Sequence, residues 1–313
     1  MTILNTFDYN SKSDYTQLRS HYQSHGFVII KGLLRDQHEL ERLRIAADLV
    51  TERTRSSKWP HKRTIGKQFP PWNQESDDVW GVQHIMHPEL DQRAFLEFYF
   101  STSLLNLVTG LTSSKELMLG LHNLLVEPIA HDHFELDWHR DSIKASTSEK
   151  EERVLLEAHL AAHPGIQWNL ALYQDECLFV VPGSHNRIRT KEERLAEGNS
   201  EEPMPGSVNV KLEAGDIVFY DAQILHRASY DTNSKRRTLH GAHLDANTDI
   251  ESSGGGIIQH FDKVKLFFQE DRFDESLRGI EGETEARKMV QRFVDWCKSV
   301  REAKMDGFVQ NDV

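Results

Sequence analysis

The sequence predicts an α+β protein whose core is mainly β, a double-stranded β-helix (a jelly roll of two sheets) flanked by N- and C-terminal helices. Between residues 117 and 245, short segments alternate apolar and polar residues and are separated by turn residues, which is typical of strands. Before and after this region, apolar residues recur at helical spacing. A jelly roll of this kind requires eight short strands, and we predict them at 118–126, 134–138, 166–173, 178–181, 208–212, 217–220, 224–229 and 238–244.

We expect one domain with three parts. These are an N-terminal helical and loop region over 1–116, the β core over 117–245 and a C-terminal helical extension over 246–313. The length of 313 residues would also allow two domains. A single core is the simpler expectation, because β-barrels with helical additions often reach this size as one domain.

The N-terminal part predicts a helix, a strand and two further helices. A polar helix is expected over 15–23 and a short apolar strand over 26–31. Asp36 and Glu39 then form a capping-box pattern ahead of apolar residues at helical spacing, which indicates the start of a second helix. The apolar spacing over 93–111 predicts another helix, packed on the outer face of a sheet.

Other segments lack a strand pattern. Residues 55–88 are rich in tryptophan and predict a long structured loop, either a wall of the active site or a packed cover. Of two polar inserts, 142–164 favours helix and 186–205 predicts a solvated excursion. Residues 252–256 are glycine-rich and predict a flexible break. The apolar stripe over 289–300 is expected to bury against the protein's own core, with a homodimer contact as the lesser alternative.

Composition limits the functional classes. The net charge of −12 argues against nucleic acid or an anionic membrane as partner, which leaves a small organic molecule. No stretch approaches the roughly 18 consecutive apolar residues of a membrane-spanning helix, and the first residues lack the pattern of a signal peptide. Cys177 and Cys297 are the only cysteines, which fits a reducing compartment. We therefore expect a cytoplasmic location.

His139 and Asp141 are the strongest candidates for metal ligands. They are two residues apart at the end of an expected strand, so both side chains point to one side while Arg140 points to the other. The pair alone would favour an ordinary ion pair between imidazole and carboxylate. His226 follows the strand expected over 217–220 and would complete two histidines and one carboxylate, the ligand set of non-heme Fe(II) oxygenases.

Four motifs, in this order, resemble the phytanoyl-CoA dioxygenase family of Fe(II)/2-oxoglutarate-dependent oxygenases. They are Trp138-His139-Arg140-Asp141, Pro182-Gly183-Ser184-His185, Gly215-Asp216 with His226, and Arg236-Arg237. The resemblance implies that His139, Asp141 and His226 are the catalytic iron ligands. It also implies that the turn over 182–185 is architectural, with His185 outside the ligand set, and that His240 and His243 support the site or the substrate.

In this family an arginine on the last core strand binds the distal carboxylate of 2-oxoglutarate, because a planar guanidinium pairs with a carboxylate through two bonds. Arg237 lies eleven residues beyond His226, which is the family's spacing, and it is the favoured candidate. Arg236 remains the alternative, since neighbouring strand residues face opposite ways. Further candidates to bind the cosubstrate are Ser229, Gln167 and Asn169.

The resemblance implies Fe(II) as cofactor, with 2-oxoglutarate and O2 as cosubstrates that yield succinate and CO2 while a small organic metabolite is oxidised. Hydroxylation is the default outcome, and Asp141 argues against a halogenase, which would need a small residue there. An alternative is a cupin-like metal-binding barrel that acts as a non-redox hydrolase or isomerase, or as a ligand-binding module. A sizeable apolar or aromatic substrate is expected to contact Trp59, Trp72, Trp80, His84 and Arg140.

Overall fold

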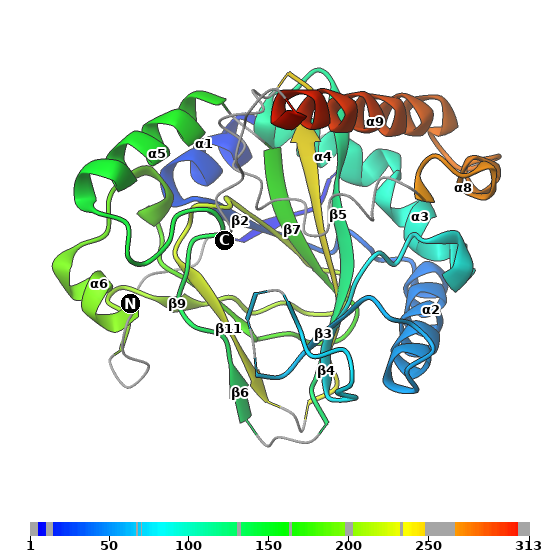
Figure 1. The fold of residues 1–313 in the computed structure, drawn as a ribbon, viewed down its shortest axis with the longest axis horizontal. Coiled ribbons are helices and arrows are strands. Elements are labelled where there is room, and N and C mark those ends of the chain that lie inside the picture. Colours follow the sequence, from blue (N-terminus) through cyan, green and yellow to red (C-terminus); the bar gives the residue numbers. More distant parts are fainter. Residues whose placement is uncertain are drawn as a thin grey trace.

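The computed structural model describes residues 6–10, 15–66, 68–69, 71–129, 133–162, 165–197, 203–231, 234–247 and 267–305. Two sheets pack face to face, and helices cover the outer side of the larger one (Figure 1). The larger sheet has eight strands in the order β1-β2-β10-β7-β12-β5-β4-β3, and the smaller has four in the order β6-β11-β8-β9.

All of the predicted core strands are present, which confirms the double-stranded β-helix. They are β5 (Leu117–Val126), β6 (His133–Glu135), β7 (Gly165–Ala171), β8 (Leu178–Val180), β9 (Val208–Asn209), β10 (Ile217–Tyr220), β11 (His226–Asp231) and β12 (Arg237–Asp245). β5, β7, β10 and β12 lie in the larger sheet, and the other four form the smaller sheet. The core therefore has four strands on each side, with its interior between them.

Four further strands extend the larger sheet at its edges: β1 (Thr6–Asp8), β2 (Phe27–Lys31), β3 (Lys62–Thr64) and β4 (Val79–Val82). β2 is the predicted apolar strand, and it pairs with β10. β3 and β4 lie within 55–88, so the prediction of a loop throughout that segment was wrong. Every residue of β3 and β4 is buried, which removes the polar alternation by which a strand is recognised.

The helices of the described residues are α1 (Tyr15–His25), α2 (Gln37–Arg55), α3 (Arg93–Tyr99), α4 (Thr102–Thr112), α5 (Glu149–Ala162), α6 (Lys191–Glu197), α8 (Asp271–Ser276) and α9 (Glu283–Met305), with 3₁₀ turns at η1 (Pro88–Leu90) and η2 (Ser184–Asn186). The predicted cap of α2 is present, since the Asp36 carboxylate accepts hydrogen bonds from two backbone amides. The helix expected over 93–111 is divided because Ser101 caps a new helix, α4.

The main apolar core lies between the larger sheet and the helices that cover it. Trp168 and Leu170 of β7 point into this core, as do Met289 and Phe293 of α9, so the C-terminal stripe packs on the protein's own core as predicted. The segment Arg93–Thr112 would suit a membrane span by length and composition, but 61% of its apolar window is buried inside the protein.

The two polar inserts form α5 and α6, which lie together at one side of the molecule (Figure 1). The prediction that 186–205 is solvated was wrong for its charged centre, because Arg189 and Glu193 are each 2% exposed. Arg189 pairs with Glu152, which comes from 142–164, a segment distant in the sequence, whereas Glu193 pairs with Arg187 of its own insert. The glycine-rich break predicted at 252–256 lies outside the described residues.

Candidate metal centre

His139, Asp141 and His226 come together at the end of the smaller sheet. His139 and His226 form an antiparallel β-bridge with reciprocal backbone hydrogen bonds of 3.0 and 3.1 Å, which places their rings 4.2 Å apart. The Asp141 amide donates to the Ala222 carbonyl, which fixes the third ligand beside the segment that leads to His226. The candidate ligand atoms of the three residues lie within 4.8 Å of one another.

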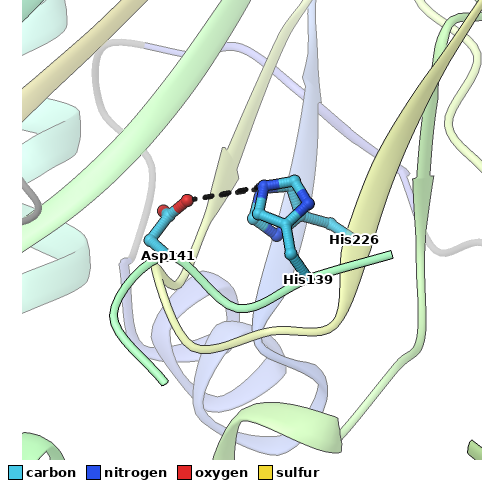
Figure 2. Close-up of side chains that lie close together, drawn as sticks. All are labelled: His139, Asp141 and His226. Carbon is cyan, nitrogen blue, oxygen red and sulfur yellow. Dashed lines mark ion pairs between the residues drawn. The ribbon is translucent and has the colours of Figure 1, made fainter. Parts of the chain in front are cut away.

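The side chains are oriented for a shared cation. Asp141 Oδ1 lies 3.7 Å from Nε2 of His139 and 3.8 Å from Nε2 of His226, and Figure 2 shows the carboxylate facing the two rings. The Nδ1 atoms contact backbone carbonyls, of Asp137 at 2.8 Å for His139 and of Ile224 at 2.9 Å for His226. In this arrangement each Nδ1–H is the donor, so each Nε2 presents a lone pair.

The protonation state of His139 argues against the ordinary ion pair. Burial lowers the pKa of His139 well below its usual value, and the neighbouring His226 imidazole lowers it further. A neutral His139 would then direct its Nε2 lone pair toward the Asp141 carboxylate, so two acceptors face each other. A metal cation between them removes this conflict. The residues therefore fit a divalent metal with an open face.

Gln167 binds the second oxygen of the Asp141 carboxylate. This glutamine lies on β7, points into the core between the sheets, and donates from its side-chain amide to Asp141 Oδ2. Oδ1 is thereby left to face the two imidazoles. The sequence placed Gln167 among cosubstrate-binding residues, but the contact that the structure shows is with a metal ligand.

Replacing Gln167 by leucine is expected to weaken Fe(II) binding by about tenfold or more, because outer partners of metal ligands typically contribute this much. The change keeps the volume of the side chain but removes the donor that holds Asp141. Anaerobic Fe(II) titration of the apo protein measures the effect. Gln174→Leu is the matched control, since Gln174 is exposed and bonds only Glu176 among the contacts described. Equal affinities of the two variants would contradict the prediction.

A cavity between the two sheets opens beside the metal ligands. Its polar wall includes Asn169, Tyr220 and His240, which are linked by hydrogen bonds of 2.9 to 3.4 Å. The described residues that line it are Arg63, Gln68, Phe69, Trp80, Leu121, Leu125, Leu136, His139, Asp141, Gln167, Asn169, Leu178, Tyr220, His226, Arg227, Ala228, Tyr230, Arg236 and His240.

Arg236 is the arginine of the predicted pair that faces the cavity. Its Nε donates to Asp175 at 3.0 Å, and its guanidinium lies 4.5 Å from the centre of the Tyr230 ring. Arg236 Nη1 and the Tyr230 hydroxyl are both buried without a hydrogen-bond partner. Buried donors are rarely left unsatisfied, so these two atoms fit the carboxylate of a bound cosubstrate.

Arg237, the arginine that the sequence favoured for the cosubstrate, points the opposite way and is not among the residues that line the cavity. Its guanidinium donates to Asp48 of α2 at 2.8 Å and to Glu127 at 2.6 Å, on the helix-covered side of the sheet. Ser229 is also turned away from the cavity and donates to Glu135 at 2.9 Å. The orientations of Arg237 and Ser229 differ from the predicted ones for the same reason. Successive strand residues alternate between the two faces of a sheet, so a shift of one residue in the register moves a side chain to the other face.

Most of the predicted substrate contacts lie elsewhere. Trp80 lines the cavity, whereas Trp59 is buried in the main core, where its Nε1 donates to the Gln83 carbonyl. Trp72 packs behind the cavity, His84 contacts Asn123 through its backbone, and Arg140 is buried in an ion pair. The lining residues that sequence reasoning missed include Arg63, Gln68, Phe69, Tyr220 and Tyr230.

For the two tyrosines a signal was available. Tyr220 ends an alternating strand, and Tyr230 shares the parity of His226 on β11, so both point to the inner face. For Arg63 no such signal existed, because β3 is fully buried and its pairing with β4 is not visible in the sequence. Its guanidinium lies 5.1 Å from the Trp80 ring and 5.7 Å from the Trp72 ring.

Solved structures share this fold. The chain is similar to EctD from S. alaskensis with 2-oxoglutarate and 5-hydroxyectoine (14% identity, TM-score 0.55, 79% of this chain and 81% of that chain). It is also similar to the α-ketoglutarate-dependent epimerase SnoN from nogalamycin biosynthesis (18%, 0.52, 74% and 81%) and to AviO1 from Streptomyces viridochromogenes Tue57 (17%, 0.52, 77% and 99%). At these identities the likeness shows the fold alone. No curated protein matches the sequence significantly.

The family follows from the sequence match. The model of the family described as phytanoyl-CoA dioxygenase (PhyH) matches residues 22–239, which include the candidate ligands His139, Asp141 and His226. This match decides between the oxygenase and the non-redox barrel that the sequence left open. The chain belongs to the phytanoyl-CoA dioxygenase family and is an oxygenase that depends on Fe(II) and 2-oxoglutarate.

Proposed function

We propose that this oxygenase hydroxylates a small organic molecule while 2-oxoglutarate and O2 are converted to succinate and CO2. The observation that carries the proposal is one cavity lined by two complementary groups. These are the candidate ligand atoms of His139, Asp141 and His226, and the unsatisfied donors of Arg236 and Tyr230. When bound, the iron and the cosubstrate supply the oxidising chemistry, and the protein supplies binding and orientation.

We assign the distal carboxylate of the cosubstrate to Arg236. Asp175 holds the guanidinium through Nε and is itself fixed by the Thr238 hydroxyl and the Cys177 amide. Burial alone would raise the pKa of Asp175, but Arg236 and these hydrogen bonds hold it below its usual value, so the pair is ionic. An arginine anchored in this way presents its remaining N–H groups without further reorganisation.

Arg63 is the second cation of the cavity wall that faces inward. Burial lowers the pKa of Arg63, while the phenols of Tyr230 and Tyr220 and the Asp141 carboxylate raise it, which places its charge among the polar groups of the cavity. Arg227 also lines the cavity, and its guanidinium pairs with Glu135 at 2.9 Å. Asp175 balances the charge of Arg236, so the wall suits an anionic ligand such as a dicarboxylate through the N–H groups that its guanidinium groups present.

Gln68 and Phe69 close the cavity over the metal ligands. The Gln68 amide accepts from the Asp137 backbone at 2.8 Å and donates back to it at 3.3 Å, which fixes this part of the loop against the metal-binding strand. The Phe69 and His139 rings meet edge to face, with their centroids 5.4 Å apart. Phe69 is exposed on its outer side, so this apolar ring partly shields the candidate ligands from solvent.

The proposal is tested with purified protein, Fe(II), ascorbate and 2-oxoglutarate. We expect a visible charge-transfer band without oxygen, and succinate on admission of air. With a panel of small carboxylate and apolar metabolites, a turned-over substrate should gain one oxygen atom from labelled O2. Succinate without oxygen transfer to any product would contradict hydroxylation, and a product of unchanged oxygen content would assign epimerisation, desaturation or ring closure instead.

A further inference from the structure

Arg140 stands between two metal ligands in the sequence, but its side chain leaves on the opposite face. His139 and Asp141 point into the cavity, whereas the Arg140 side chain is 0% exposed and lies beneath the metal-binding segment. A buried guanidinium loses its hydration and is stable only when its donors and its charge are matched. The groups that match Arg140 are three backbone carbonyls and the carboxylate of Glu152.

The donors of Arg140 reach carbonyls from segments beyond its own strand. Nη1 donates to the Ser184 carbonyl at 2.9 Å and also to the Gln223 carbonyl, while Nη2 donates to the Arg187 carbonyl at 3.0 Å. Gln223 lies three residues before His226. Arg140 thus connects the strand of two metal ligands to the segment that carries the third.

The second connection runs through the turn over 182–185. The Ser184 hydroxyl accepts from the Leu225 amide at 2.8 Å, next to His226, while the Ser184 carbonyl binds Arg140. Arg140 therefore supports the His226 segment twice, through Gln223 and through Ser184. This turn was expected from the sequence to be architectural, and its Ser184 joins Arg140 to the backbone next to His226.

The charge of Arg140 is matched by Glu152 of α5. Arg140 Nε lies 3.2 Å from Glu152 Oε1, and the glutamate is 0% exposed. Glu152 also pairs with Arg189 at 2.6 Å and with Arg194. Because the glutamate is held from several sides, it fixes the orientation of the Arg140 guanidinium, and with it the position of the three carbonyls.

We propose that Arg140 is the positioning residue of the metal centre. It sets the distance between the segment of His139 and Asp141 and the segment of His226 before metal binds, so that the ligands need no rearrangement. The inference rests on the proposed metal centre. Ligand sets work only when held within about 0.5 Å of their geometry, and a lysine in place of Arg140 would keep the charge beside Glu152 but lose the fork that reaches the carbonyls.

The test compares Arg140→Lys with Arg194→Lys. Arg194 pairs with the same glutamate and donates to the Thr147 carbonyl, but its described contacts include no carbonyl of the ligand segments. Co(II) alone is the probe, titrated calorimetrically into apo protein without 2-oxoglutarate. We expect Arg140→Lys to weaken Co(II) binding by about tenfold or more, as removal of an outer partner does, and Arg194→Lys to leave it unchanged.

Hydrogen exchange of the apo proteins gives a second readout. The amides of His139, Asp141 and His226 are bonded between the two ligand segments, so in Arg140→Lys they should exchange faster, while those of β10 keep their protection. If Arg140→Lys does not unfold cooperatively, Arg140→Gln replaces it in the same two assays. Wild-type Co(II) affinity in the Arg140 variants, or an equal loss in Arg194→Lys, would overturn the proposal. Failure of wild-type protein to bind Co(II) would instead overturn the metal centre.

Discussion

Replacing Arg236 by lysine is expected to raise the KM for 2-oxoglutarate at least about tenfold, because a lysine loses the bidentate pairing that a guanidinium offers a carboxylate. Lysine retains a positive charge beside Asp175, so the buried ion pair persists and the protein still folds. The N–H group that is unsatisfied in the cavity is lost with the guanidinium. The expected effect falls on cosubstrate binding, with Fe(II) affinity unchanged.

Arg237→Lys is the matched control. The two arginines are adjacent and both are buried, but Arg237 bonds Asp48 and Glu127 on the far side of the sheet. Its replacement should lower the melting temperature and leave the KM for 2-oxoglutarate as it is. Succinate formation at a series of 2-oxoglutarate concentrations measures both variants. A raised KM in Arg237→Lys with a normal KM in Arg236→Lys would return the role to Arg237.

The candidate metal ligands could be identified in the sequence because their signal is local, and the structure brings them together. His139 and Asp141 share one face of an extended segment, and His226 begins the strand that bridges to them. The eight core strands could be predicted because they are short apolar segments separated by turn residues, although β5, β10 and β12 are buried along nearly their whole length. Neither prediction needed any knowledge of which strands are neighbours.

The choice between Arg236 and Arg237 depends on how β12 pairs with the neighbouring strand. Arg237 pairs with Val126 of β5, and this register turns Arg236 inward. A count of residues from His226 carries no information on the length of the connection between β11 and β12, and an error of one residue reverses the face.

The buried charges show a second limit of the sequence. Residues 186–205 look solvated because Arg and Glu are rarely buried unless paired. One of the partners, Glu152 of the Arg189 pair, stands in another insert. Such pairing is a property of the assembled fold. The same holds for Arg140, which sequence alternation placed away from the metal but whose contacts only the structure reveals.

Replacing Asp141 by alanine is expected to abolish specific Fe(II) binding. The loss should exceed the ~10–100-fold that removal of an outer partner causes, because Asp141 supplies the only carboxylate among the three ligands. Metal that binds the folded state alone raises its stability by about 2.7 kcal/mol at 100 times the dissociation constant. Wild-type protein should therefore melt at a higher temperature with Fe(II), and Asp141→Ala should not.

His240→Gln is the control for the metal-ligand prediction, and it also tests a rival ligand. His240 lines the same cavity and contacts Asn169 at 2.9 Å, but it lies outside the three-residue cluster. Its variant should keep the metal-dependent rise in melting temperature. If His240→Gln loses the metal-dependent rise in melting temperature and Asp141→Ala keeps it, the metal binds on the Asn169 side of the cavity instead. The melting temperatures of the two variants without metal separate this outcome from a general loss of stability.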